Sequence, residues 1–323
     1  MSQFDCFNGD ADGICALTQL RRAHPLDTKL ITGVKRDVAL LDSILGQVKS
    51  GDSVTVLDVS LDKNRSALQA MLERSVSVFY CDHHFAGEIP ISEQFTSIIN
   101  TAPETCTSML INEHLQGAYL DWAVAGAFGD NLDKSATALA KRLSINEQQL
   151  ATLQSLGMYL NYNGYGATTA DLYFHPADLV MQTKHFDSAL DFVDQQPDIY
   201  ATLEQGYHDD MRRAEQAKTV FDATYARVVE LDAGSWSRRV SGVYGNALAN
   251  ESVDKAHAVL THKDDEHFVV SVRAPLSNRR GADEVCRQFE SGGGRAAAAG
   301  INALPKADLA KFVDVFSAHY AVS

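Results

Sequence analysis

Carboxylate and imidazole side chains gather in four short segments of the N-terminal half of this sequence. The segments FNGDADG, LDVS, CDHH and AFGD contain Asp10, Asp12, Asp58, Asp82, His83, His84 and Asp130. Carboxylates that converge without a basic partner repel one another, and divalent cations relieve that repulsion. Carboxylates with imidazole, and without thiolates, favour manganese or a similar metal over a cysteine-rich zinc site. The residue types therefore predict a divalent-metal centre.

A pair of such metals would indicate phosphoryl chemistry. Two ions about 3.5–4 Å apart can clamp the attacking and leaving oxygens of an in-line displacement. Each segment alone is a weaker signal, since an acidic turn such as DADG commonly caps a helix N-terminus. Their joint occurrence, each at the end of an expected strand or helix, favours a shared site.

The surrounding pattern predicts how these segments converge. Continuous apolar runs predict strands at 4–7, 29–33, 53–59, 75–81 and 96–100, with helices at 13–22 and 62–74. Strands that alternate with helices indicate an α/β fold with a parallel sheet and helices on both faces. Loops at the carboxyl ends of such strands line one crevice, so the groups around Asp10, Asp58 and Asp82 should meet there.

The rest of the chain divides into a helical stretch and a second sheet. We expect helices at 105–115, 119–128, 151–160 and 198–220, the last as a connection between domains. Strands are expected at 225–231, 238–245, 256–263 and 267–274, and helices at 284–290 and 306–320. The predicted domains are 1–200 for metal binding and catalysis, 201–221 as a helical linker, and 222–323 as a smaller α/β substrate-binding domain.

Composition narrows the class of protein. The 323 residues are 45% hydrophobic and 22% charged, as expected of a soluble protein with two domains. The N-terminus lacks the features of a secretory signal, and no apolar run is long enough for a bilayer, so a cytoplasmic location without membrane partners is expected. The net charge of −14 argues against tight binding of long nucleic acid, which needs a basic surface, but not against a small anionic substrate.

The four acidic segments resemble the motifs of the DHH phosphoesterases. The segments SVRAP and GGGRAAAAG resemble the signature of the DHH-associated C-terminal domain, so the resemblance runs from residue 4 to about residue 302. The family includes RecJ single-strand exonucleases, nanoRNases acting on short RNA and 3′-phosphoadenosine 5′-phosphate, cyclic dinucleotide phosphodiesterases and, with a different second domain, manganese pyrophosphatases.

The resemblance implies a role for each site residue. Asp10 and Asp58 would bind a first metal, with Asn8 where many members have histidine or aspartate. Asp12, Asp58, His83 and Asp130 would bind a second. Asp82 would orient a histidine, and His84 would approach the substrate phosphate or assist proton transfer. The implied cofactor is two Mn²⁺ ions, with Mg²⁺ or Co²⁺ as alternatives, and the implied catalytic set is Asp58, His83 and His84.

The resemblance also implies that Arg273 and a loop formed by Gly292, Gly293, Gly294 and Arg295 hold the distal part of the substrate. Glycines let backbone N–H groups approach an anion closely, and an arginine can fork onto phosphate oxygens. A tight glycine-rich turn before an alanine-rich packing segment is the alternative. Arg295 replaces the usual histidine of the signature and stays charged at neutral pH.

The leading functional hypothesis is metal-dependent hydrolysis of a phosphoester in a small nucleotide or short oligonucleotide. A RecJ-like single-strand exonuclease is one alternative. A non-catalytic nucleotide-binding sensor that retains the fold is another, which Asn8 and Arg295 favour. The sequence leaves the substrate open, as well as the choice between a monomer and a homodimer.

Overall fold

The computed structural model describes residues 1–321 and divides the chain into two compact units, Met1–Gln205 and Gly206–Ser323. The boundary falls within helix α10 (Pro197–Ala214). The helix expected over 198–220 is therefore too long at its C-terminal end, since strand β6 (Lys218–Asp222) follows it. The division into two domains and a separate linker stays a prediction.

The first unit is built on a parallel sheet of five strands in the order β2-β1-β3-β4-β5. The strands are β1 (Gln3–Phe7), β2 (Lys29–Ile31), β3 (Ser53–Leu57), β4 (Ser77–Asp82) and β5 (Phe95–Ile99). Phe7 pairs with Leu57, and Leu57 with Cys81, so β1, β3 and β4 end side by side. The acidic segments that follow these strands consequently start from one edge of the sheet.

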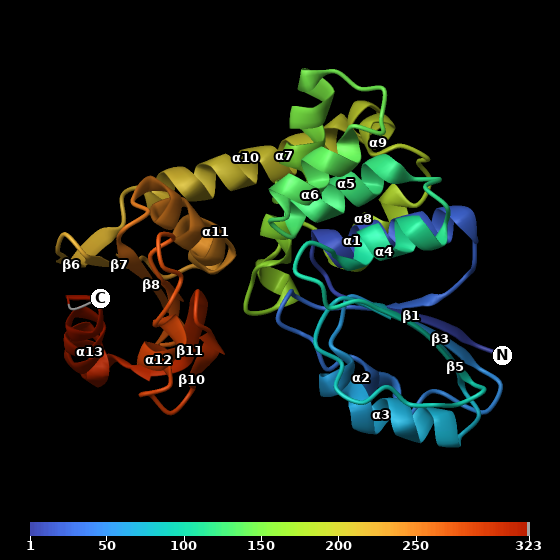
Figure 1. Cartoon of the computed structure of the whole chain (residues 1–323), viewed down its shortest axis with the longest axis horizontal. Coiled ribbons are helices and arrows are strands. Elements are labelled where there is room, and N and C mark those ends of the chain that lie inside the picture. Colours follow the sequence, from blue (N-terminus) through green and yellow to red (C-terminus); the bar gives the residue numbers. More distant parts are fainter. Residues whose placement is uncertain (322–323) are drawn as a thin grey trace. The chain divides into compact units, whose positions relative to one another are not determined.

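Helices cover both faces of this sheet, as expected for the α/β class (Figure 1). Helices α2 (Leu41–Ile44) and α3 (Leu61–Glu73) lie on one face, and α1 (Ala11–Ala23) and α4 (Thr107–His114) on the other. The remaining helices of the unit are α5 (Leu120–Gly129), α6 (Asp133–Ala140), α7 (Glu147–Gly164), η1 (Thr169–Asp171), α8 (Pro176–Thr183) and α9 (Ala189–Gln195). Helices α2, α6, α8 and α9 were not expected, because segments of four to eight residues are too short to show a helical period.

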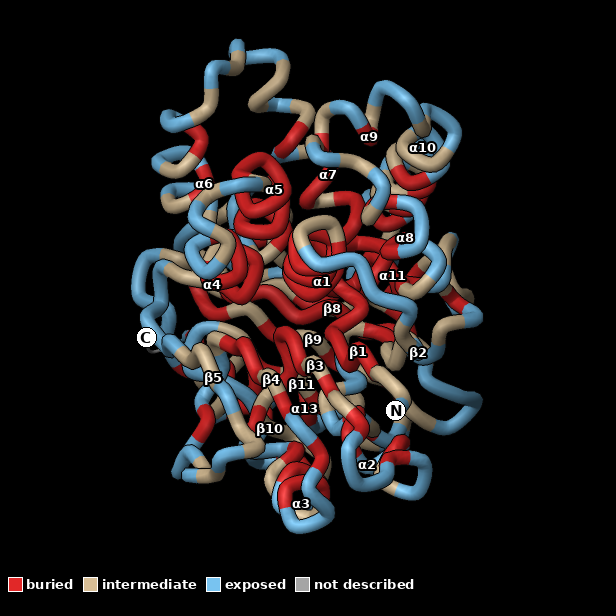
Figure 2. The backbone as a smooth tube through the Cα atoms, turned by 90° about the vertical axis from the view of Figure 1, so that its right-hand side faces the viewer, coloured by how far each residue is buried: buried red, intermediate tan, exposed pale blue. Residues whose placement is uncertain are grey.

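Helix α5 is buried along its whole length and packs against α1 and α7 (Figure 2). The close approach to α1 depends on Gly129, where an added Cβ would lie 2.2 Å from the Cβ of Ala11. Asp130 follows directly as the residue that ends α5. The packing of two helices thus brings Asp130 towards the start of α1, where Asp12 lies.

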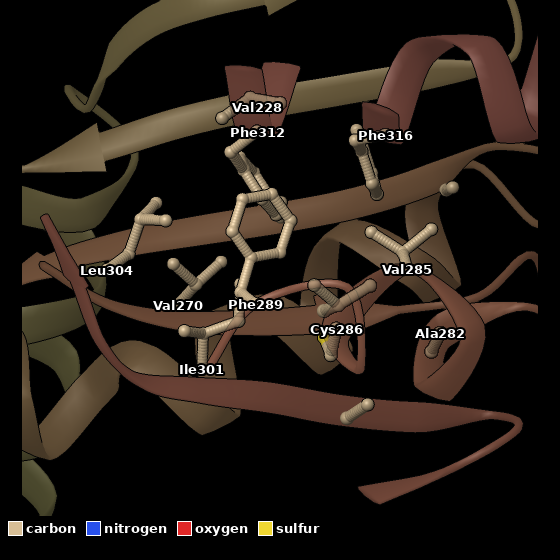
Figure 3. Packing of buried hydrophobic residues seen from close by; sticks show 14 of the residues in the cluster. Val228, Val270, Ala282, Val285, Cys286, Phe289, Ile301, Leu304, Phe312 and Phe316 are labelled. Atoms are coloured by element: carbon tan, nitrogen blue, oxygen red, sulfur yellow. The ribbon is translucent and has the colours of Figure 1, made fainter. Parts of the chain in front are cut away.

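The second unit has its own mixed sheet and hydrophobic core. The strand order is β10-β11-β9-β8-β7-β6, with β7 and β8 parallel and the other pairs antiparallel. Its further elements are β7 (Ala226–Leu231), α11 (Ser235–Glu251), β8 (Ala256–His262), β9 (His267–Arg273), α12 (Ala282–Cys286), β10 (Gly292–Arg295), β11 (Ala298–Pro305), η2 (Lys306–Asp308) and α13 (Leu309–Ala321). Phe312 and Phe316 of α13 stack at 5.7 Å and pack with Val228 and Val270 of the sheet (Figure 3).

Two expectations for the second unit are wrong. Residues 238–245 are not a strand but part of α11, because Val240, Tyr244 and Leu248 recur every four residues and form one buried helical face. The helix expected at 284–290 covers instead Ala282–Cys286.

Within residues 1–321, no helix has both the length and the apolar character needed to cross a membrane. Five cysteines lie buried in the structure, each as a free thiol.

Candidate metal centre

The side chains predicted from the acidic segments come together beyond the ends of β1, β3 and β4. The Nε2 atom of His83 lies 3.4 Å from Asp58 Oδ1, 3.7 Å from Asp130 Oδ2 and 3.9 Å from Asp12 Oδ2. Octahedral ligands at about 2.1 Å from an ion lie about 3.0 Å apart when adjacent and about 4.2 Å apart when opposite. The distances from His83 to the three carboxylates therefore fall in the range for ligands that share an ion, although that role stays a prediction.

Asp58 has a strained backbone conformation, and its buried carboxylate lies close to other acidic side chains. Its backbone is left-handed, with φ of +59°, a conformation that non-glycine residues seldom adopt and that is enriched at functional sites. Its N–H donates to the carbonyl of Cys81, and its Oδ1 accepts a hydrogen bond of 3.1 Å from the hydroxyl of Thr107. Burial, followed by the charges of Asp12 and Asp10, raises the pKa of Asp58 well above its usual value.

Asp12 is fixed by the first turn of α4. Its two carboxylate oxygens accept 2.7 Å hydrogen bonds from the backbone N–H groups of Thr107 and Ser108. These donors have no partner within the helix, and the positive end of the helix dipole favours a carboxylate there. The sequence analysis missed Thr107 and Ser108. A Cys-Thr-Ser segment at the start of an expected helix was the available signal.

Asp82 orients His84 rather than His83. Its Oδ1 lies 2.7 Å from His84 Nδ1, whose side chain is 44% exposed. Burial lowers the pKa of His84, but its hydrogen bond to Asp82 and the negative charge of that carboxylate outweigh this, and the pKa is raised overall. Because the carboxylate accepts, Nδ1 carries the proton and Nε2 is the atom left for a substrate.

Asp10 and Asp130 share a basic neighbour that the sequence analysis missed. Lys35 Nζ lies 2.5 Å from Asp10 Oδ2 and 3.9 Å from Asp130 Oδ1. Burial raises the pKa of Asp10, but the charge and hydrogen bond of Lys35 outweigh it and lower the pKa below its usual value. Burial raises the pKa of Asp130 to about 6, against the opposing charge of Lys35.

The site fits a divalent cation. Asp58, His83 and His84 each offer a ligand atom within 4.8 Å of the others. Two buried oxygens at the cluster, Asn8 Oδ1 and Asp82 Oδ2, have no hydrogen-bond partner. Buried acceptors without a partner are costly, and a cation supplies the missing interaction.

The residues expected to bind the distal part of the substrate lie in the second unit. The guanidinium of Arg273 donates to Asn246 Oδ1 at 2.6 Å and to the carbonyl of Gly242 at 3.2 Å, so it is already held within that unit. Arg295 is exposed at the end of β10. Their role in substrate binding stays a prediction.

The glycine segment Gly292–Arg295 is a strand, not a loop. It pairs with β11, and an added Cβ on Gly292 would lie 1.7 Å from the carbonyl oxygen of Cys286, while one on Gly294 would lie 2.5 Å from Ala299 Cα. These two glycines are required by close packing. Gly293 has open space beside it, so it alone of the three leaves room for a ligand.

The first unit carries an Asp–His cluster at the carboxyl ends of a five-stranded parallel sheet, and the second unit has a mixed sheet. Together these features define a two-unit α/β protein with a candidate metal centre. No known family profile and no curated protein matches the sequence. Solved structures do match. One is described as the DHH domain of a member of a family of ribosomal proteins, with 12% identity over 98% of this chain and 86% of that chain and a TM-score of 0.65.

Exonuclease RecJ bound to manganese has 16% identity, covers 99% of this chain and 90% of its own, and gives a TM-score of 0.64. The pGpG-specific phosphodiesterase PggH from Vibrio cholerae has 15% identity over 99% of this chain and 100% of its own, with a TM-score of 0.54. The protein therefore has the DHH-domain fold. This confirms the fold that the resemblance of the four motifs implied.

Proposed function

We propose that the protein is a divalent-metal-dependent hydrolase of phosphoester bonds in a small nucleotide or short oligonucleotide. The observation that carries this proposal is the position of His83 Nε2, within 3.9 Å of carboxylate oxygens from Asp12, Asp58 and Asp130. Proteins of the same fold include an exonuclease bound to manganese and a pGpG-specific phosphodiesterase. Mn²⁺ is the proposed cofactor, and Mg²⁺ or Co²⁺ are alternatives.

A divalent cation, when bound, supplies charge stabilisation for a phosphoryl group and acidifies water at neutral pH. Asp12, Asp58, His83 and Asp130 are proposed to hold it. Asp82 engages His84 through Nδ1, which leaves Nε2 available to donate a hydrogen bond to a phosphate oxygen or a proton to the leaving oxygen. The raised pKa of His84 increases the protonated fraction that this role needs.

The substrate is proposed to be short because the chain carries a formal net charge of −14. Long strands are usually bound through phosphate contacts with basic side chains, which give a steep dependence on salt. A RecJ-like exonuclease is the second candidate, favoured by the fold shared with RecJ. Salt-dependent binding of long single strands would distinguish it.

A panel assay with Mn²⁺ tests the proposal. The substrates are linear dinucleotides, cyclic dinucleotides, 3′-phosphoadenosine 5′-phosphate, pyrophosphate and long single strands, and we expect turnover of a short nucleotide. Asp58→Ala should abolish that turnover, whereas Asp27→Asn, at an exposed loop position, should not change it. Full turnover by Asp58→Ala would refute the site. No turnover of any substrate with tight nucleotide binding would instead support the sensor.

A further inference from the structure

A lysine lies inside the acidic cluster. The side chain of Lys35 is only 23% exposed, and its ammonium lies 2.5 Å from Asp10 Oδ2 and 2.8 Å from Asn161 Oδ1. The more distant carboxylate of Asp130 faces it at 3.9 Å. The ammonium thus has two oxygen neighbours at hydrogen-bond distance and a third oxygen beyond. These oxygen neighbours resemble the surroundings of a bound metal ion.

The backbone around Lys35 is held in place by its neighbours. Its N–H donates to the carbonyl of Gly164 at 2.8 Å, and its own carbonyl accepts from the side-chain amide of Asn8 at 3.4 Å. The segment also packs directly on the loop between β1 and α1, because an added Cβ on Gly9 would lie 2.0 Å from the carbonyl oxygen of Gly33. The ammonium is therefore built into the site rather than carried on a free loop.

Lys35 engages the carboxylate that the family resemblance assigns to a first metal. Asp10 Oδ1 accepts from the N–H of Gly13 at 3.2 Å, and Oδ2 accepts from Lys35. The second residue of that metal set, Asn8, offers only an uncharged oxygen. The ligands expected for the first metal are therefore one neutral amide, one carboxylate paired with lysine, and Asp58. Asp58 is also expected to bind the second metal.

The second metal set keeps all four side chains that the resemblance assigns to it. Asp12, Asp58 and Asp130 each direct one carboxylate oxygen to within 3.9 Å of His83 Nε2. The Asp130 oxygen that faces His83 is Oδ2, whereas Oδ1 is the one nearer Lys35. Three carboxylates and an imidazole suit one divalent ion.

We propose that the centre binds one divalent cation, through Asp12, Asp58, His83 and Asp130, and that the ammonium of Lys35 takes the place of a second metal. This inference rests on the proposed function, since it concerns the same site. A lysine in this place neutralises Asp10 and repels a further divalent ion. It still offers a positive charge and N–H donors to a phosphate, but cannot acidify a bound water as a metal does.

The test counts ions. Wild-type protein is equilibrated with Mn²⁺, bound metal is counted by native mass spectrometry, and the bound ions are examined by electron paramagnetic resonance. We expect one ion per chain, with the spectrum of an isolated Mn²⁺. The double variant Lys35→Met with Asn8→His should bind two ions with magnetic coupling, and the matched control Lys134→Met, at an exposed position on α6, should bind one.

Each result separates this inference from the function on which it rests. Two ions in the wild type would overturn the role of Lys35 and leave a metal-dependent hydrolase intact. A single ion in the double variant would show that Lys35 is not what excludes the second metal. No bound ion in the wild type would refute the metal centre itself, and the proposed function with it.

Discussion

Replacing Asp130 by asparagine should stabilise the metal-free protein at neutral pH. The pKa of Asp130 is raised from its usual 3.8 to about 6, so the folded state disfavours the ionised carboxylate. At about 1.4 kcal/mol per pKa unit, ionisation of this group costs the folded state about 3 kcal/mol at most. The side chain keeps 21% of its surface exposed, and solvent screening lowers the cost below this limit.

The sign of the pH dependence follows from the raised pKa. Well below pH 3.8 the carboxyl is protonated in both the folded and the unfolded state, so Asp130→Asn and wild type should be equally stable. As pH rises through the interval from about 3.8 to above 6, the wild type loses stability because the unfolded state ionises more readily than the folded state, whereas the variant does not. The difference should therefore open across this interval and remain constant at pH 8.

The assay is urea unfolding in EDTA at pH 4.5 and pH 8, with Asp27→Asn as the control for an exposed aspartate. The control should change stability by less than about 0.5 kcal/mol. Excess Mn²⁺, at about 100 times its dissociation constant, should then stabilise wild type by about 2.7 kcal/mol and the variant by less. A variant less stable than wild type at pH 8 in EDTA, or a difference independent of pH, would refute the electrostatic reasoning.

Three further predictions concern metal binding, proton transfer and substrate binding. Thr107→Val removes the hydroxyl donor of the Asp58 carboxylate and should weaken Mn²⁺ binding about 2- to 12-fold, measured by calorimetry, since one hydrogen bond contributes about 0.5–1.5 kcal/mol. Asp82→Asn should lower the pKa of His84 and move the alkaline limb of the kcat profile to lower pH; an unmoved limb would exclude His84 as the titrating acid. Arg295→Ala should raise KM for the short substrate and leave Mn²⁺ affinity unchanged, whereas Arg287→Ala, also exposed, should leave both unchanged.

The convergence of the acidic segments could be predicted because it depends on strand topology. Apolar runs with short helical connections specify a parallel sheet, and the residues after β1, β3 and β4 must then emerge at one edge. Asp10, Asp58 and Asp82 are placed by this rule alone. The strand predicted at 238–245 is wrong for the opposite reason. The valines of this segment suit a strand, and only packing against the rest of the second unit shows that they belong to the buried face of helix α11.

The sequence by itself determined the α/β class, the parallel sheet and the identity of the clustered acids, because these follow from local periodicity and from the order of elements. Only the tertiary structure decided which polar and charged side chains contact the clustered acids and their lysine. Lys35 meets Asn161, 126 residues away, through the packing of α7, and Thr107 meets Asp58 through the docking of α4. No local pattern marks such contacts, because the side chains become neighbours only after helices that are distant in sequence have packed together.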